Sequence, residues 1–348
     1  MKEKLIFLFP GQGAQYPGMG LDFLREKGEG KREEVIGDRE QVIGNKEQFK
    51  LIRIKELFDL ASELLKRDMR ALLRDTSSDE LKRTDIAQPA ITLVNLAAAA
   101  YLAENGIKAS ACAGFSLGEY AAFALSGIIS EADCFFLVDE RGKAMQTAVD
   151  KINSPQPQDG SAVTPNSKPQ FGMAAIIGLA PEKAEALTLE IPQLYAANIN
   201  SPKQIVVSGS AAALEEAEKH FKAAGALRVI RLSVAGPFHS PFMKDAAEAF
   251  APALEKVQFN DPVIPVFSNV TGKQIKSGSE AKSLALRQIT EGVRWTDIEA
   301  SIALLEPSAL LETGPGKVLQ GLWKDTGSRT PCYPAGNKDE IDKLGGFY

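Results

Sequence analysis

The chain has 348 residues, enough for one large domain or two of ordinary size, and at this length folding buries roughly three quarters of the unfolded surface. Its composition, with 44% hydrophobic and 24% charged residues, 29 glycines and 19 prolines, excludes collagen-like, low-complexity and wholly disordered chains. A net charge of −5 gives no general attraction to nucleic acid or to anionic lipid, so neither is expected as a partner.

The three cysteines, Cys112, Cys134 and Cys332, are odd in number and form no C-x-x-C pair. They therefore support neither a disulfide framework nor a cysteine zinc site, and they indicate a reducing compartment. The apolar run at residues 5–9 is too short for a signal peptide. We therefore expect a cytoplasmic protein.

The first predicted element is a buried strand at residues 5–9, followed by the glycine-rich turn 10–13. Residues 25–50 carry many charges of both signs and few large apolar side chains, which predicts a surface insertion. The longest charge-free stretch, 86–103, predicts a buried helix with Pro89 in its first turn rather than a membrane span. A second strand at 110–115 then runs directly into an alanine-rich helix.

The segment 153–170 is rich in proline and predicts a loop. Six elements follow it in the order strand, helix, strand, strand, helix, strand, at residues 171–178, 181–190, 194–200, 204–210, 211–224 and 228–234. That order is typical of a ferredoxin-like unit. Beyond it helices and strands alternate again, at residues 241–256, 263–268, 296–305, 309–312 and 317–323.

These patterns predict an α/β protein with two domains. The large one resembles an α/β-hydrolase, has a parallel sheet and is discontinuous, comprising residues 1–152 and 235–348. The small ferredoxin-like domain, residues 171–234, is inserted into it.

The segment Gly114-Phe115-Ser116-Leu117-Gly118 has the pattern G-x-S-x-G between a predicted strand and a predicted helix. In that context the glycines permit a tight turn that exposes the serine hydroxyl, so Ser116 is a candidate nucleophile. The five-residue pattern alone equally fits an ordinary turn of small residues. The flanking strand and helix favour the nucleophile.

A serine nucleophile needs a base, and histidine is the usual one. The chain has two histidines. His220 lies in a highly charged helical segment, which predicts a solvated side chain, whereas His239 lies in the kinked apolar turn 235–241. By elimination His239 is the candidate base.

An oxyanion formed at Ser116 would need backbone donors. The N–H of Leu117, at the start of the helix, is the first candidate. The turn Gly11-Gln12-Gly13 could bring a second N–H close, although alone it is equally well a tight turn between strand and helix.

Seven separated motifs occur in the order found in malonyl-CoA:acyl carrier protein transacylases, which the chain resembles from residue 5 to about 335. They are Phe9-Pro10-Gly11-Gln12-Gly13-Ala14-Gln15, Gln88-Pro89-Ala90, Gly114-x-Ser116-Leu117-Gly118-Glu119-Tyr120, Arg141-Gly142-x-x-Met145-Gln146, Asn198-x-Asn200-Ser201-Pro202-x-Gln204, Gly236-Pro237-Phe238-His239-Ser240 and Glu312-x-Gly314-Pro315-Gly316. The resemblance is interrupted at 25–50 and 153–170.

The resemblance implies transfer of a malonyl group from coenzyme A to a serine, and then to the phosphopantetheine thiol of acyl carrier protein, for fatty acid biosynthesis. It places the nucleophile at Ser116, the base at His239 and the residue that binds the malonyl carboxylate at Arg141. Malonyl-CoA and acyl carrier protein are then substrate and partner, no cofactor or metal is expected, and we expect a monomer.

The resemblance also implies that Gln288 orients the histidine through an amide or backbone carbonyl, since no aspartate matches a triad partner. Gln12 and Leu117 match the oxyanion donors. Gln88 and Asn200 match residues that line the pocket, and capping or turn hydrogen bonds are an equal alternative for both.

Two aromatic residues bear on acyl selectivity. The bulk of Phe238 resembles the pattern that favours malonyl over methylmalonyl groups. Phe115 replaces the histidine that usually precedes the nucleophile in this family, which predicts altered turnover or acyl tolerance rather than lost chemistry.

Three alternatives stay open at this point. A serine hydrolase or thioesterase would share the serine and histidine, although it would not need Arg141. A trans-acting acyltransferase of polyketide synthesis would share every residue named. A catalytically silent binding protein would need none of them. Acyl carrier proteins are acidic, so we expect a basic patch near the pocket mouth.

Overall fold

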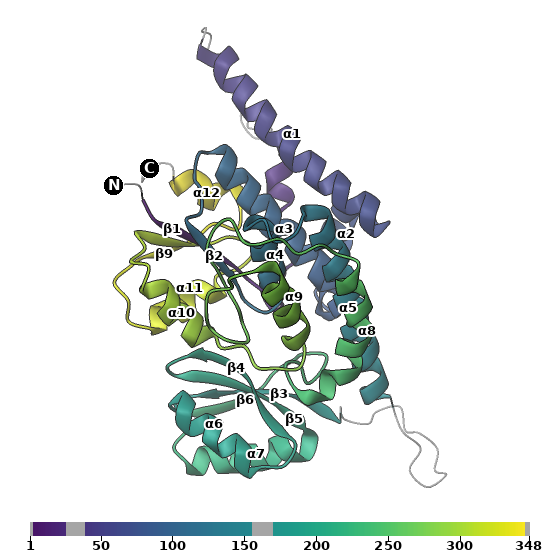
Figure 1. Cartoon of the computed structure of the whole chain (residues 1–348), viewed down its shortest axis with the longest axis vertical. Helices are drawn as coiled ribbons and strands as arrows, with labels where there is room; N and C mark the ends of the chain where they lie inside the picture. Colours follow the sequence, from purple (N-terminus) through teal and green to yellow (C-terminus); the bar gives the residue numbers. More distant parts are fainter. Residues whose placement is uncertain (1–2, 26–38, 155–169, 345–348) are drawn as a thin grey trace.

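The computed structural model describes residues 3–25, 39–154 and 170–344, with the side chains of the first long helix described from residue 51. A parallel sheet of five strands forms its centre (Figure 1). The strands, in their order across the sheet, are β7 (Val266–Phe267), β2 (Ala111–Gly114), β1 (Leu5–Phe9), β8 (Ala309–Glu312) and β9 (Cys332–Pro334). The predicted α/β class with a parallel sheet is confirmed.

The central strand β1 is apolar throughout and buries both of its faces, as strands of a parallel sheet between two helical layers do. Its side chains alternate between the layers. Leu5, Phe7 and Phe9 pack in the larger core cluster, while Ile6 and Leu8 pack in a second cluster on the opposite face.

The larger cluster draws apolar side chains from one group of helices. These helices are α1 (Arg39–Leu65), α2 (Met69–Asp75), α3 (Thr84–Glu104), α4 (Gly118–Leu125), α5 (Glu131–Asn153), α8 (Lys244–Glu255), α9 (Gly278–Arg287) and α12 (Lys338–Leu344). The second cluster takes its helical side chains from α10 (Trp295–Ala303) and α11 (Val318–Asp325). Short 3-10 turns occupy Leu21–Leu24, Glu80–Lys82 and Pro241–Met243.

The second sheet is antiparallel and has four strands. In chain order its elements are β3 (Phe171–Ile177), α6 (Pro181–Glu190), β4 (Leu194–Ser201), β5 (Gln204–Ser210), α7 (Ala211–Ala223) and β6 (Arg228–Arg231). Their order across the sheet, β4-β5-β3-β6, is that of a ferredoxin-like unit. We retain 171–234 as the proposed limits of this domain.

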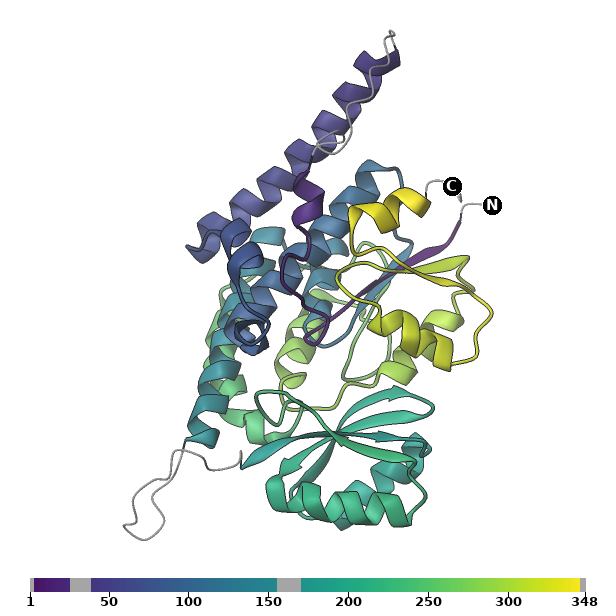
Figure 2. The ribbon, with the colours of Figure 1, turned by 180° about the vertical axis from the view of Figure 1, so that it is seen from behind.

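Helices α6 and α7 cover the face of the small sheet that points away from the parallel sheet (Figure 2). Two backbone hydrogen bonds join strand β4 to the large body. Ile199 donates to the carbonyl of Val293, and Val293 donates to the carbonyl of Ala197, both at 2.8 Å. The small sheet is therefore joined to the large body by backbone pairing as well as by side-chain packing.

The sequence did not predict the helix that begins inside the surface insertion. Helix α1 begins at Arg39, inside the predicted surface insertion 25–50, and its first turns extend away from the body (Figure 1). Apolar residues at helical spacing from Ile54 to Leu65 anchor its second half in the core. Residues 26–38, and 155–169 of the predicted proline-rich loop, lie outside the described residues.

Helix α3 passes between other helices through the larger core cluster. Among the described residues it is the one helix long and apolar enough to cross a membrane, and 83% of its most apolar window is buried inside the protein. The prediction of a buried helix here is confirmed. The predicted position of Pro89 in the first turn is wrong, because the helix begins at Thr84 and the proline falls in its second turn.

A proline in the second turn cannot donate to the carbonyl four residues earlier, which here is that of Asp85. Arg67 supplies the missing donor, because its Nη1 lies 3.0 Å from the oxygen of Asp85. The helix therefore tolerates its proline with a hydrogen bond from outside the helix.

We predict that Arg67→Met lowers the free energy of unfolding by about 1.5–3 kcal/mol, the range for a hydrogen bond to a charged group. In a Pro89→Ala background the new N–H can satisfy Asp85, so the same substitution should cost roughly 1 kcal/mol less. Urea unfolding of the four chains measures this cycle. An equal loss of unfolding free energy in both backgrounds would contradict the role of Arg67 as the donor to Asp85.

Candidate active site

The turn between β2 and α4 holds Ser116 in a left-handed conformation, with φ at 49°. Glycine is required on both sides. A Cβ on Gly114 would lie 2.0 Å from the carbonyl carbon of Gly118, and one on Gly118 would lie 2.1 Å from the oxygen of Phe9. This tight turn is the one that the G-x-S-x-G pattern predicted, and it raises the serine side chain into a cleft.

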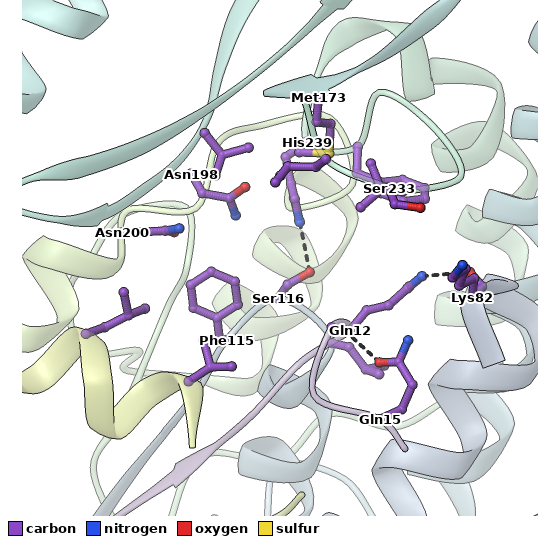
Figure 3. A pocket seen from close by; sticks show the side chains of 18 of the residues that line it. Gln12, Gln15, Lys82, Phe115, Ser116, Met173, Asn198, Asn200, Ser233 and His239 are labelled. Atoms are coloured by element: carbon purple, nitrogen blue, oxygen red, sulfur yellow. Dashed lines mark hydrogen bonds between the residues drawn. The ribbon is translucent and has the colours of Figure 1, made fainter. Parts of the chain in front are cut away.

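His239 lies beside the serine, although 123 residues separate the two in the chain. Its Nε2 is 2.8 Å from Oγ of Ser116 (Figure 3). Its Nδ1 is 2.8 Å from the backbone oxygen of Gln288. A carbonyl only accepts, so Nδ1 carries the proton and Nε2 of the neutral ring accepts from the serine. The structure therefore brings together three of the predicted site residues.

The environment of His239 opposes its protonation. The ring is buried, and burial lowers the pKa to about 4, with a further contribution from the positive charge of Arg141. The hydrogen bond to the carbonyl of Gln288 acts in the opposite direction. At neutral pH the imidazole is therefore uncharged and able to take a proton.

The turn after β1 approaches the serine turn closely. A Cβ on Gly11 would lie 2.3 Å from the oxygen of Phe115, so glycine is required at this contact. The backbone N–H groups of Gln12 and Leu117 donate to no acceptor within the described part of the chain. The side chain of Gln12 is held by the carbonyl of Lys82, at 3.3 Å. Both predicted oxyanion donors thus line the cleft beside Ser116.

Arg141, on α5, is 1% exposed and also lines the cleft. Its Nη1 donates to Oε1 of Gln88 at 2.9 Å, its Nη2 donates to Oε1 of Gln288 at 2.8 Å, and the ring of Tyr120 lies 5.6 Å away. Its Nε has no partner, and no carboxylate forms an ion pair with it among the described residues. Because burying an unpaired charge is costly, this arrangement favours an anionic ligand.

The cleft has a volume of about 540 Å³ and is lined by residues of both the small sheet and the large body. Asn198, Asn200 and Met173 face it from β4 and β3, and Phe115 lines it from the large body (Figure 3). Phe238 also lines it. Of the predicted pocket residues, Asn200, Phe115 and Phe238 therefore lie in the cleft. The phenyl ring of Phe115 packs edge-on against Trp295, with the ring centroids 5.2 Å apart.

Gln88 does not line the cleft as predicted. It is fully buried on α3, behind Arg141, where it accepts from the guanidinium and donates to the sulfur of Met145 at 3.4 Å. Its amide was assigned to the pocket because of its motif, but the guanidinium stands between it and the cavity.

Asn269 is a site residue that the sequence did not reveal. Its Oδ1 accepts from the N–H of Ser116 at 2.7 Å, and its Nδ2 donates to the carbonyl of Gly114 at 2.7 Å. It follows β7 at the carboxyl edge of the parallel sheet, where ligand sites of such sheets gather. The sequence offered one indication of this residue, which is a polar side chain directly after a short apolar strand.

Groups of three or more His, Cys, Asp or Glu side chains arranged to hold a metal ion do not occur within residues 3–25, 39–154 and 170–344.

Comparisons with known proteins agree with this geometry. The acyl transferase domain family matches residues 6–154 and 160–342. The malonyl CoA-acyl carrier protein transacylase of Escherichia coli is 36% identical over 325 residues, 92% of each chain, and that of Bacillus subtilis is 32% identical over 344 residues, 98% of this chain and 96% of its own. A malonyl-transacylase solved in complex with a type II PKS acyl-carrier protein has a TM-score of 0.80 and 31% identity, covering 99% of this chain and 100% of its own.

Fold and family together define an acyl transferase domain. Within that class, the identity over nearly the whole length shows that the chain belongs to the family of the malonyl CoA-acyl carrier protein transacylases. The resemblance seen in the seven motifs is thereby confirmed.

We predict that His239 remains uncharged down to about pH 5, with a protonation midpoint near 4. The unfolded chain binds the proton near pH 6.5, so between these values the unfolded state binds more protons and the protein loses stability as pH falls. Nitrogen-15 NMR of a His220→Gln chain, which has a single imidazole, measures the midpoint. A value of 6 or above would contradict the prediction.

Proposed function

We propose that this chain is an [acyl-carrier-protein] S-malonyltransferase of fatty acid biosynthesis that works through a malonyl ester on Ser116. The observation that carries the proposal is the Ser116–His239 pair beside Arg141, a buried cation with no carboxylate partner among the described residues. The relatives named as malonyl CoA-acyl carrier protein transacylases, and the complex with an acyl-carrier protein, support the substrate and the partner.

In the first half-reaction the oxygen of Ser116 attacks the thioester carbonyl while Nε2 of His239 takes the serine proton. The N–H groups of Gln12 and Leu117 stabilise the oxyanion, since both residues line the cleft and neither N–H donates elsewhere in the described part of the chain. The carbon–sulfur bond then breaks, and His239 returns the proton to the sulfur of coenzyme A. The malonyl group remains as an ester.

The second half-reaction runs the same steps toward the carrier. His239 takes the proton of the phosphopantetheine thiol, the sulfur attacks the ester carbonyl, and the bond to Ser116 breaks as the serine regains a proton. Throughout, the carbonyl of Gln288 holds the ring of His239 in one tautomer. Every step uses groups of this chain and its substrates, so the proposed reaction requires no cofactor.

Arg141 selects the acyl group. A guanidinium can bind the free carboxylate of malonate with two hydrogen bonds, and an acetyl group in the same place would leave the buried charge unpaired. Phe238 is the residue proposed to crowd an α-methyl branch. A simple acyl hydrolase has no use for such a cation, which favours the transferase.

The cysteines and the lysines near the cleft bear on the compartment and on binding of the carrier protein. The free thiols of Cys112, Cys134 and Cys332 support a reducing compartment, and we place the enzyme in the cytoplasm. Lys82 and Lys317 line the cleft and supply positive charge for an acidic carrier protein, although each also pairs with an acidic neighbour.

We predict that the purified chain incubated with malonyl-CoA gains one malonyl group by intact mass, that holo acyl carrier protein discharges it, and that Ser116→Ala abolishes it. Arg141→Ala should lower kcat/KM for malonyl-CoA roughly 10- to 100-fold, the effect of losing a charge-assisted hydrogen bond, and affect acetyl-CoA much less. Arg74→Ala, an exposed arginine on α2, is the control. Malonate released as fast as coenzyme A, with no gain from carrier protein, would favour the hydrolase instead.

We predict that Phe115→His changes turnover or acyl tolerance, because an imidazole adds a hydrogen-bonding group to the wall of the cleft. The loss of the edge-on contact with Trp295 should also cost about 0.5–1.5 kcal/mol of stability. Transfer rates for malonyl, methylmalonyl and acetyl groups, together with thermal unfolding, measure both effects. Three unchanged rates would refute the functional part.

A further inference from the structure

Glu119, on α4, is fully buried directly beneath the serine turn. Its Oε1 accepts from the backbone N–H of Asn269 at 2.7 Å, and its Oε2 accepts from Nε2 of Gln288. Its carboxylate therefore contacts two residues that themselves hold the nucleophile, the base and the guanidinium. None of the steps derived above uses it.

The contact with Gln288 fixes which way the glutamine amide points. On one side the amide meets a carboxylate, which only accepts, and on the other it meets Nη2 of Arg141, which only donates, at 2.8 Å. The nitrogen must therefore face Glu119 and the oxygen must face the arginine. The nitrogen also donates to the carbonyl of Ser116 at 2.9 Å, so the same amide touches the serine turn.

The other oxygen of Glu119 reaches the nucleophile through Asn269. That asparagine holds the serine turn by bonds to the N–H of Ser116 and the carbonyl of Gly114. The backbone oxygen of Gln288, meanwhile, holds His239. One carboxylate thus stabilises the relative positions of the nucleophile, the base and the cation.

Burial raises the pKa of Glu119 to about 7, even though the hydrogen bonds from Asn269 and Gln288 and the positive charge of Arg141 favour the ionised form. The carboxylate form therefore predominates above neutral pH, and both of its contacts are with donors at any pH. The negative charge reaches the arginine through the glutamine amide rather than by direct contact, which leaves the guanidinium able to bind a substrate carboxylate.

We propose that Glu119 is a positioning residue that fixes the amide of Gln288, and through it Arg141, and so sets the preference for carboxylated acyl groups. The inference rests on the proposed function, because it names a residue that acts on the same site. It adds a residue that touches neither the substrate nor the reacting atoms.

The decisive variant is Glu119→Gln, which keeps the shape but replaces one acceptor by a donor. With its oxygen still bound to the N–H of Asn269, the new amide nitrogen would face Nε2 of Gln288, and two donors cannot bond. Rotation of the Gln288 amide relieves this conflict and turns a nitrogen toward Arg141. We expect KM for malonyl-CoA to rise about 10-fold with a smaller change in kcat, and the ratio of kcat/KM for malonyl-CoA to that for acetyl-CoA to fall about 10-fold.

The matched control is Glu299→Gln. Glu299 is also a buried glutamate, but it accepts one hydrogen bond, from Nε1 of Trp295, which an amide oxygen can keep. This variant should leave the malonyl-to-acetyl ratio unchanged. An equal fall in that ratio would show that loss of any buried carboxylate lowers the selectivity, and it would overturn the proposal.

A second test places Glu119→Gln in an Arg141→Ala background. If Glu119 acts through the arginine, it should have no further effect on the ratio there. An undiminished effect would overturn the proposal, as would a folded Glu119→Gln chain with unchanged selectivity. Glu119→Asp keeps two acceptor oxygens on a shorter arm, so it should give an intermediate loss. If neither variant folds, the carboxylate is a folding requirement and the proposal is wrong.

A readout without turnover separates this inference from the proposed function. Malonate alone should bind the wild-type chain, measured by calorimetry, and bind Glu119→Gln roughly 10-fold more weakly. A wild-type chain that binds malonate with this dependence but forms no acyl-enzyme would refute the transfer reaction and keep the inference. Equal malonate affinity in both chains would refute the inference alone.

Discussion

The buried guanidinium of Arg141 is the constraint on which the rest of the site depends. Placing a cation where water cannot reach it is costly, and the usual solution is a carboxylate in direct contact. Here the neighbours are instead two amide oxygens and an aromatic ring. They solvate the charge without neutralising it, so a substrate carboxylate does not have to displace an internal one.

The same charge affects the base. Together with burial it lowers the pKa of His239, which keeps the imidazole neutral and ready to accept a proton, but also makes it a weak base in the empty site. A carboxylate bound to Arg141 opposes that effect. Burial is the larger cause of the low pKa, so binding of a carboxylate offsets only the part that Arg141 contributes.

The sequence predicted the parts of this site that lie within single motifs. The glycines on both sides of Ser116 indicate a tight turn because no other residue fits there, and His239 followed from the scarcity of histidine. Strand β1 was found because its apolar run ends at a proline and a glycine, whereas the short strand β9 was not predicted. Helix α1 was missed because its first half lies in a highly charged segment, and charge alone does not distinguish an exposed helix from a loop.

Contacts between distant segments could not be predicted in this way. Gln288 was matched to a histidine partner, but its side chain also holds Arg141 and Glu119, which lie 147 and 169 residues away in the chain. Neither the periodicity nor the spacing of residues in the sequence indicates contacts over such separations. It arises because the carboxyl ends of β2 and β7 lie side by side and the segment after α9 returns to the same edge. Arg141 only donates, so one orientation of the Gln288 amide satisfies the contacts of its oxygen and its nitrogen, and the hydrogen bonds specify the site more strictly than its apolar surroundings do.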